Sequence, residues 1–123
     1  MALILSSCHS SINTTDLYGK WKYVKVDNPN ANPPDSVKKA DLAEQSPSIQ
    51  FSKSNELTIV WGGKILSHGK FIVDGMNIRY KEALPDGKVR EFPFWVSKLT
   101  DKELVFETSG ENGSKVTAVR DDR

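Results

Sequence analysis

The sequence predicts an all-β domain: an eight-stranded antiparallel up-and-down barrel with one short helix in the connection between its first two strands. Apolar and polar residues alternate along short segments, which is the period-two pattern of half-buried strands. Glycine-containing turns that suit hairpins separate most of these segments. A meander of this kind removes its two free edges when it closes on itself.

Composition limits the function classes that need considering. The 123 residues fit one domain, and 17 Lys and Arg against 16 Asp and Glu give a net charge of +1. This balance gives no electrostatic indication of a nucleic-acid partner. The single cysteine excludes an internal disulfide. No apolar run approaches the roughly 20 residues that span a bilayer.

The first predicted strand runs from Asp16 to Asp27, with Trp21 expected to plug one end of the barrel. The segment Asn28 to Pro34 is read as a loop, because proline donates no hydrogen bond to a strand ladder. A helix over Val37–Glu44 follows, capped by Asp35 or Ser36.

Seven further strands follow at regular spacing. On the third of them, Ile65, Phe71 and Val73 are expected to face inward, and Gly69 is a candidate β-bulge. The predicted ranges are Ser48–Lys53, Glu56–Trp61, Lys64–Val73, Met76–Glu82, Lys88–Lys98, Glu103–Thr108 and Lys115–Arg120.

The N-terminal segment Leu5-Ser6-Ser7-Cys8 resembles the cleavage box of a bacterial lipoprotein signal peptide. The resemblance implies that Cys8 is lipidated and becomes the mature N-terminus. The apolar run before it is shorter than the roughly 7–15 residues of a working signal. Residues 1–15 are therefore expected to be a truncated lipoprotein leader and tether, with the barrel domain over residues 16–123. The alternative is a chance cysteine in a disordered leader.

Three short motifs fall at the start of the first strand, in the turn between the sixth and seventh strands, and near the end of the last strand. They are Gly19-Lys20-Trp21, Thr100-Asp101 and Arg120. Together they resemble the lipocalins, and more closely the small lipocalin-like domains of bacterial lipoproteins, whose late Leu-Thr-x-x-x-Leu matches Leu99-Thr100 and Leu104. The resemblance implies a structural role for Gly19, Trp21, Thr100, Asp101 and Arg120, with Arg120 stacked on Trp21 at the closed end.

Aromatic residues on the predicted strands are candidates to line a ligand cavity at the opposite end. Ligand pockets are mostly apolar with a few placed polar groups. A ligand is expected to enter past Trp61 and Tyr80. The open alternative is that the same aromatic residues fill the barrel as its core. The candidate lining residues are Tyr23, Phe51, Trp61, Phe71, Tyr80, Trp95 and Phe106.

The functional interpretation is a lipid-anchored, extracytoplasmic lipocalin-like protein of the bacterial cell envelope, in the periplasm or at the cell surface, that binds a small apolar or amphipathic ligand. Its expected partners are that ligand and the membrane, through Cys8. The alternative is an anchored protein-interaction module with a filled barrel. No enzyme activity, metal or cofactor is expected, because His68 has no Cys, Asp or Glu beside it at ligand spacing. The chain also has no phosphate-binding glycine loop.

Overall fold

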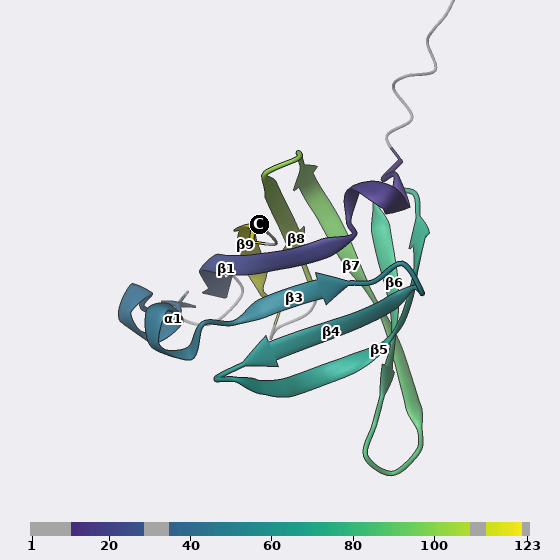
Figure 1. The fold of residues 1–123 in the computed structure, drawn as a ribbon, viewed down its shortest axis with the longest axis horizontal. Coiled ribbons are helices and arrows are strands. Elements are labelled where there is room, and N and C mark those ends of the chain that lie inside the picture. The colour runs from purple at the N-terminus through teal and green to yellow at the C-terminus, as the bar shows by residue number, and fades with distance from the viewer. Residues whose placement is uncertain (1–10, 29–34, 109–112, 122–123) are drawn as a thin grey trace, which may run out of the picture.

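The computed structural model of the chain describes residues 11–28, 35–108 and 113–121. Its strands form one antiparallel sheet that curls into a barrel (Figure 1). A short 3-10 helix, η2 (Thr14–Asp16), precedes the barrel, and the α-helix α1 (Lys39–Gln45) lies beside it. The strands are β1 (Gly19–Asn28), β2 (Asp35–Ser36), β3 (Ser48–Phe51), β4 (Glu56–Trp61), β5 (Lys64–Asp74), β6 (Asn77–Ala83), β7 (Val89–Leu99), β8 (Glu103–Glu107) and β9 (Lys115–Arg120).

Pairing between the first and last strands closes the barrel. β1 pairs with β3 along residues 19–22 and with β9 along residues 21–27. From β3 to β9, each strand pairs with the next one in the chain, always antiparallel. The two-residue β2 pairs only with the last two residues of β1. The predicted eight-stranded antiparallel barrel is therefore confirmed, with β2 as a short addition beside it.

A tryptophan and an arginine close one end of the barrel. Trp21 is fully buried, and the guanidinium carbon of Arg120 lies 4.0 Å from the centre of its ring. The two residues face each other in the β1–β9 register, and Trp21 Nε1 donates to the Leu17 carbonyl oxygen at 2.9 Å. A cation over an aromatic face contributes about 0.5–2 kcal/mol. The predicted stack is confirmed.

Arg120 also binds the segments that cover this closed end. Its guanidinium donates to the carbonyl oxygens of Tyr18 at 2.6 Å, Asp16 at 3.0 Å and Asp101 at 3.3 Å. Asp101 lies in the β7–β8 turn, where the Thr100 hydroxyl oxygen accepts hydrogen bonds from the next two N–H groups after Asp101. A guanidinium suits this role because its five donors lie in one plane. The motif residues thus join the first strand, the last strand and a turn.

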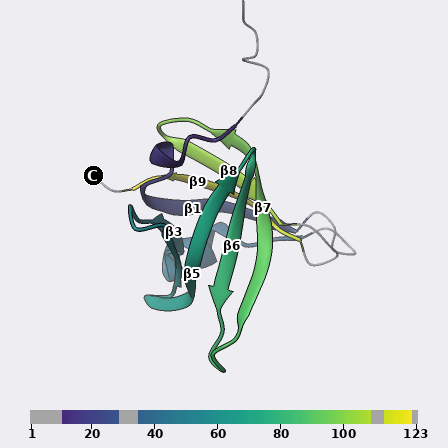
Figure 2. The same cartoon turned by 90° about the vertical axis from the view of Figure 1, so that its right-hand side faces the viewer.

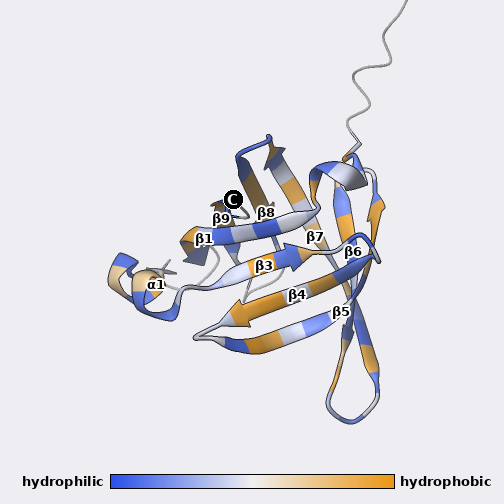
Figure 3. Cartoon of the chain, in the orientation of Figure 1, coloured by the Kyte–Doolittle hydropathy of each residue, from blue (hydrophilic) through white to orange (hydrophobic). Residues whose placement is uncertain are grey.

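Apolar side chains pack the interior above Trp21. Apolar and polar residues alternate along the strands (Figure 3), which places one set inside. Full burial of an aliphatic or phenylalanine side chain contributes about 1.5–3 kcal/mol. From its closed end to its middle, the barrel is therefore a filled core, as expected by the alternative in which the aromatic residues fill the barrel. Its fully buried members include Leu17, Ile49, Leu57, Phe71, Ile78, Tyr80, Val96 and Leu104.

The helix begins later than predicted. The sequence suggested a start at Val37 with Asp35 or Ser36 as the cap, but α1 begins at Lys39 and its N-cap residue makes no side-chain capping hydrogen bond. Asp35 and Ser36 pair with the end of β1 instead, and the Val37 N–H donates to a β1 carbonyl oxygen at 2.9 Å. The sheet extension occupies the backbone that the predicted first turn needed.

A β-bulge reverses the direction in which the start of β5 faces. The register of β5 against β4 skips Leu66, which has no partner there. An extra residue in one strand shifts the in-and-out alternation beyond it. Ile65 is therefore 64% exposed, and the prediction that it faces inward is wrong. Gly69, the expected site of the bulge, pairs regularly with both neighbouring strands.

Gly69 marks the place where β5 changes partners. In the sheet register, residues 64–68 pair only with β4 and residues 72–74 pair only with β6. A Cβ atom on Gly69 would lie 2.0 Å from the Lys81 carbonyl oxygen, a contact that side chains do not make. Glycine therefore allows the backbones of β5 and β6 to approach closely at this position. The β4–β5 and β6–β7 hairpins diverge from here (Figure 1).

Candidate functional site

The candidate site is the open end of the barrel, opposite the Trp21–Arg120 stack, which we call the mouth. β4 and β6 end there, and β5 and β7 begin there. The C-terminus of α1 is tied to the β4–β5 hairpin, because the Gly62 N–H donates to the Gln45 carbonyl oxygen at 2.8 Å. Figure 2 shows β5, β6 and β7 side by side, with the β6–β7 hairpin extending beyond the barrel.

Aromatic rings cross the interior below the mouth. The ring centres of Tyr23 and Trp61 lie 6.3 Å apart and those of Tyr23 and Phe106 lie 6.1 Å apart. The contacts continue from Phe106 through Phe94 to Phe92. Aromatic pairs at about 4.5–7 Å stabilise by about 0.5–1.5 kcal/mol beyond burial. Trp61 and Phe92 lie at the two ends of this series of ring contacts, and they are its partly exposed members.

A chain of hydrogen bonds accompanies the aromatic rings. Ser67 Oγ lies 2.5 Å from Tyr80 Oη and donates to Glu82 Oε2 at 2.6 Å. A hydroxyl has one hydrogen, so Ser67 gives its own to the carboxylate and accepts that of Tyr80. Arg90 Nε donates to Glu82 Oε1 at 3.0 Å, and its guanidinium lies 5.3 Å from the Phe92 ring centre. Every donor in this series of hydrogen bonds points toward Glu82. The Tyr80 oxygen can therefore accept a further hydrogen bond but has no hydrogen left to donate.

The Tyr23 hydroxyl has no hydrogen-bond partner among the residues that the structure describes. Its residue is 6% exposed. Every fully buried polar side-chain atom of the described residues has a partner, so solvent must reach this hydroxyl. Burial raises the pKa of Tyr23 well above its ordinary value, and the neighbouring Tyr80 raises it further. Tyr23 is therefore a protonated hydrogen-bond donor at neutral pH.

Tyr23 and Tyr80 should make the fold sensitive to alkaline pH. Burial raises the pKa of both side chains in the folded protein, whereas in the unfolded chain they ionise near pH ~10. Above that pH the unfolded state loses protons that the folded state keeps, so the free energy of unfolding falls as pH rises; below it the contribution is fully present. We expect the phenolate absorbance of these two tyrosines to appear together with the loss of far-UV circular dichroism. Their ionisation in a protein that remains folded would contradict this.

The structure brings most of the predicted lining residues into the interior. These are Tyr23, Phe51, Trp61, Phe71, Tyr80 and Phe106. Trp95 is the exception: it is 48% exposed on the outer face of β7, whose inward residues are Phe92, Phe94 and Val96. The prediction that Trp95 lines the interior is therefore wrong. Tyr80 also differs from expectation, because it is fully buried rather than at the rim.

Four residues of the mouth were missed by the sequence analysis: Ser67, Glu82, Arg90 and Phe92. Glu82 lies two residues beyond the inward Tyr80, and Arg90 faces Glu82 in the β6–β7 register. Continuing the alternation by one step would therefore have placed both side chains inward. A charged side chain considered alone is expected to face solvent. The ion pair between Glu82 and Arg90, which neutralises both charges, becomes apparent only when β6 and β7 are paired.

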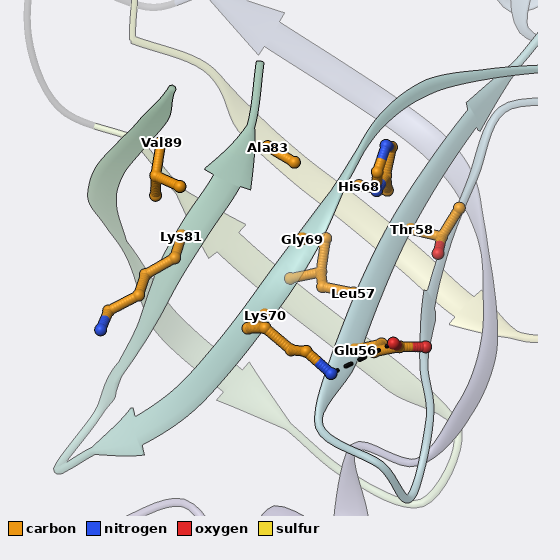
Figure 4. Close-up of a pocket in the computed structure, with 9 residues that line it drawn as sticks. All are labelled: Glu56, Leu57, Thr58, His68, Gly69, Lys70, Lys81, Ala83 and Val89. Carbon is orange, nitrogen blue, oxygen red and sulfur yellow. Dashed lines mark hydrogen bonds and ion pairs between the residues drawn. The ribbon is translucent and has the colours of Figure 1, made fainter. Parts of the chain in front are cut away.

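A separate groove lies on the outer face of the barrel, where the two hairpins diverge at Gly69. Its volume is about 350 Å³. Figure 4 shows Lys70 bound to Glu56 at one side of the groove, with His68, Lys81 and Val89 also on its walls. All three of these wall residues are exposed.

Two further sequence predictions concern metals and the membrane. Within the described residues, no group of three or more His, Cys, Asp or Glu side chains could hold a metal ion. None of the helices in the described ranges is long and apolar enough to cross a bilayer. The candidate lipidation site Cys8 lies outside the described residues.

Comparison with known proteins identifies the fold. No protein-family model and no curated protein matches the sequence. Among solved structures, the chain is similar to a lipocalin-like protein from Bacteroides uniformis, with a TM-score of 0.60 and 18% sequence identity. The match covers 86% of this chain and 99% of the other. The closed antiparallel meander together with this similarity shows a lipocalin-like fold, as the motifs predicted.

Proposed function

We propose that this lipocalin-like barrel is a lipid-anchored, extracytoplasmic protein of the bacterial cell envelope that binds a small apolar or amphipathic ligand at its mouth. The observation that carries the proposal is the partial exposure of Trp61 and Phe92, two aromatic side chains that face inward at the open end. Partly exposed aromatic side chains beside a few placed polar groups are typical of small-molecule sites.

The packed core limits how deep a ligand can enter. Phe71, Ile78 and Val96 are at most 1% exposed. In the sheet register they lie opposite the aromatic residues Tyr80, Phe94 and Phe106. The ligand therefore rests on the aromatic rings and extends outward between the hairpins. The site suits a small ligand or one end of a longer apolar molecule.

The anchor is proposed at Cys8. One acyl chain gives only marginal membrane binding, so a stable anchor needs a second chain or another signal. Mass spectrometry of the protein extracted from its source membrane is expected to find Cys8 lipidated. An unmodified Cys8, or an unchanged membrane distribution of Cys8→Ser, would remove the anchor from the proposal without affecting the mouth.

Binding at the mouth is expected to depend on Trp61. Titration of the protein with an environment-sensitive hydrophobic dye should give saturable binding. Trp61→Ala should weaken that binding about tenfold, because it removes one of the two exposed aromatic contacts. Trp95→Ala is the matched control, since it removes the same side chain from the outer face and should leave the affinity unchanged. Saturable binding that is equal in wild type and Trp61→Ala would place the site elsewhere.

A second candidate function, an anchored protein-interaction module, is favoured by the exposed hairpin ends. Ile65 is 64%, Leu66 65% and Val89 62% exposed. Apolar side chains that gather at the ends of loops on a rigid scaffold often contact a partner. If wild type shows no saturable binding of apolar ligands, this interpretation replaces the first.

A further inference from the structure

The segment before β1 is attached to the closed end of the barrel from Ile12 onward. The Ile12 side chain belongs to the core cluster and is 8% exposed, and the Ile12 N–H donates to the Gly75 carbonyl oxygen at 2.9 Å. Gly75 lies in the β5–β6 turn, at the end of the barrel opposite the mouth. In Figure 2, η2 lies at the top and the β6–β7 hairpin at the bottom. The chain therefore joins the barrel seven residues before β1 begins at Gly19.

Further contacts hold the residues between Ile12 and β1. Asn13 Oδ1 accepts hydrogen bonds from the Thr15 N–H at 3.2 Å and from the Thr15 hydroxyl at 2.8 Å, which caps η2. Leu17 follows and is fully buried. Arg120 binds the carbonyl oxygens on both sides of Leu17. The segment cannot leave the closed end without breaking these hydrogen bonds and exposing two apolar side chains.

We propose that the barrel is held at its membrane with the closed end toward the lipid surface and the mouth away from it. This inference rests on the proposed function, because it takes the lipid anchor at Cys8 as given. Ile12 follows Cys8 by four residues, and a fully extended chain of that length spans at most about 14 Å. The anchor therefore keeps the closed end close to the lipid headgroups.

The height of the barrel excludes the inverted orientation. β5 runs from the mouth to the closed end over 11 residues, so a tilted strand of about 3.3 Å per residue gives a barrel about 25–30 Å tall. With the mouth against the membrane, the anchor segment would have to span this height, and about 14 Å is too short. If the chain were free as far as Gly19, it could span about 40 Å and both orientations would be possible. The attachment at Ile12 therefore decides the orientation.

Electrostatic attraction adds nothing to this orientation. Lys53 and Lys102 are exposed in turns of the closed end, and Asp16 and Asp101 are exposed beside them. A negatively charged lipid surface attracts a protein through an excess of lysine and arginine, and the attraction falls as salt rises. The orientation is therefore expected to be the same on neutral and anionic bilayers, and at low and high salt.

The orientation also restricts how a ligand reaches the mouth. With the mouth facing away from the lipid surface, a ligand enters from the aqueous side. A molecule dissolved in the bilayer has to leave it before it can bind. The arrangement therefore favours ligands with appreciable solubility in water over long-chain lipids that stay in the bilayer.

The single cysteine of the chain allows a direct test. Cys8 of the wild-type protein is coupled to a maleimide-headgroup lipid in a phosphatidylcholine nanodisc that also carries a gadolinium-labelled headgroup lipid. Nuclear magnetic resonance then measures the paramagnetic broadening of the amide signals of Gly75, at the closed end, and Gly87, in the β6–β7 turn beyond the mouth. The Gly75 signal should be broadened more strongly than the Gly87 signal, with and without anionic lipid.

Ile12→Asp tests the attachment that sets the orientation. A carboxylate is costly to bury in the core cluster, so this variant should release the segment and reduce the difference in broadening between Gly75 and Gly87. Far-UV circular dichroism checks that the barrel remains folded. Ile72→Asp is the matched control, because Ile72 is 55% exposed on β5 and its replacement should preserve the wild-type pattern.

The outcomes separate this inference from the proposed function. Equal broadening of the two signals in wild type, or stronger broadening of Gly87, would overturn the orientation and leave the anchor and the ligand-binding mouth in place. A folded Ile12→Asp variant with the wild-type pattern would overturn the role of Ile12. An unmodified Cys8 in protein from the source membrane would overturn the proposed anchor, and this inference with it.

Discussion

Trp21→Ala is expected to lower the free energy of unfolding by about 3–5 kcal/mol, the usual cost of truncating a buried aromatic side chain. Trp21 is fully buried, and its loss also removes the ring under Arg120 and the hydrogen bond to the Leu17 carbonyl oxygen. A small domain has about 5–15 kcal/mol in total, so this change removes a large part of its stability. Chemical denaturation followed by far-UV circular dichroism measures the loss.

Two further variants separate the contributions to this effect. Trp95→Ala removes the same side chain from the outer face and should change the free energy of unfolding by no more than about 0.5 kcal/mol. Trp21→Phe keeps an aromatic face for Arg120 but loses the Nε1 donor, and should fall between the two. If Trp21→Ala lowers the free energy of unfolding by less than about 1 kcal/mol, the Trp21–Arg120 stack contributes little to the stability of the barrel.

Gly69→Ala is expected to destabilise the protein by about 1–3 kcal/mol or more, the cost of forcing extra volume into a packed site. The added Cβ would lie 2.0 Å from the backbone oxygen of Lys81, which cannot move without shifting β6. At a site without this contact, the same change would stabilise by about 0.4–1 kcal/mol through the unfolded state. The sign of the measured effect therefore tests the close approach directly.

His68→Ala is the control for Gly69→Ala. His68 is the preceding residue in β5 and is exposed, so its truncation should cost little. A Gly69→Ala variant as stable as wild type would mean that β5 does not approach β6 in the way described.

The strand order was predictable because the turns have strong local signals. Gly62 and Gly63 both have positive φ values, +64° and +79°, as a tight hairpin turn requires. Gly75 likewise has a positive φ, in the turn after β5. These turns fix a meander, and a meander with regular spacing has few ways to bury its apolar faces other than closing.

The bulges and the polar chain were not predictable from one strand at a time. Leucine is not a residue type that marks a bulge, yet Leu66 is the extra residue that turns Ile65 outward. Ser67 and Glu82 become neighbours only when β5 and β6 pair, and the hydrogen bond between them is a property of that pairing. Trp95 was expected to line the interior because it is an aromatic residue on a predicted strand, whereas the neighbouring Phe94 occupies the interior.

The central claim is that a small apolar ligand binds at the mouth, and nuclear magnetic resonance of the tryptophan indole N–H groups tests it most directly. The three tryptophans report from three places: Trp21 at the closed end, Trp61 at the mouth and Trp95 on the outer face. Titration with octanol is expected to shift the Trp61 signal in a saturable manner and to leave those of Trp21 and Trp95 in place. A saturable shift of Trp95 without one of Trp61, or no shift of any indole signal, would contradict the account.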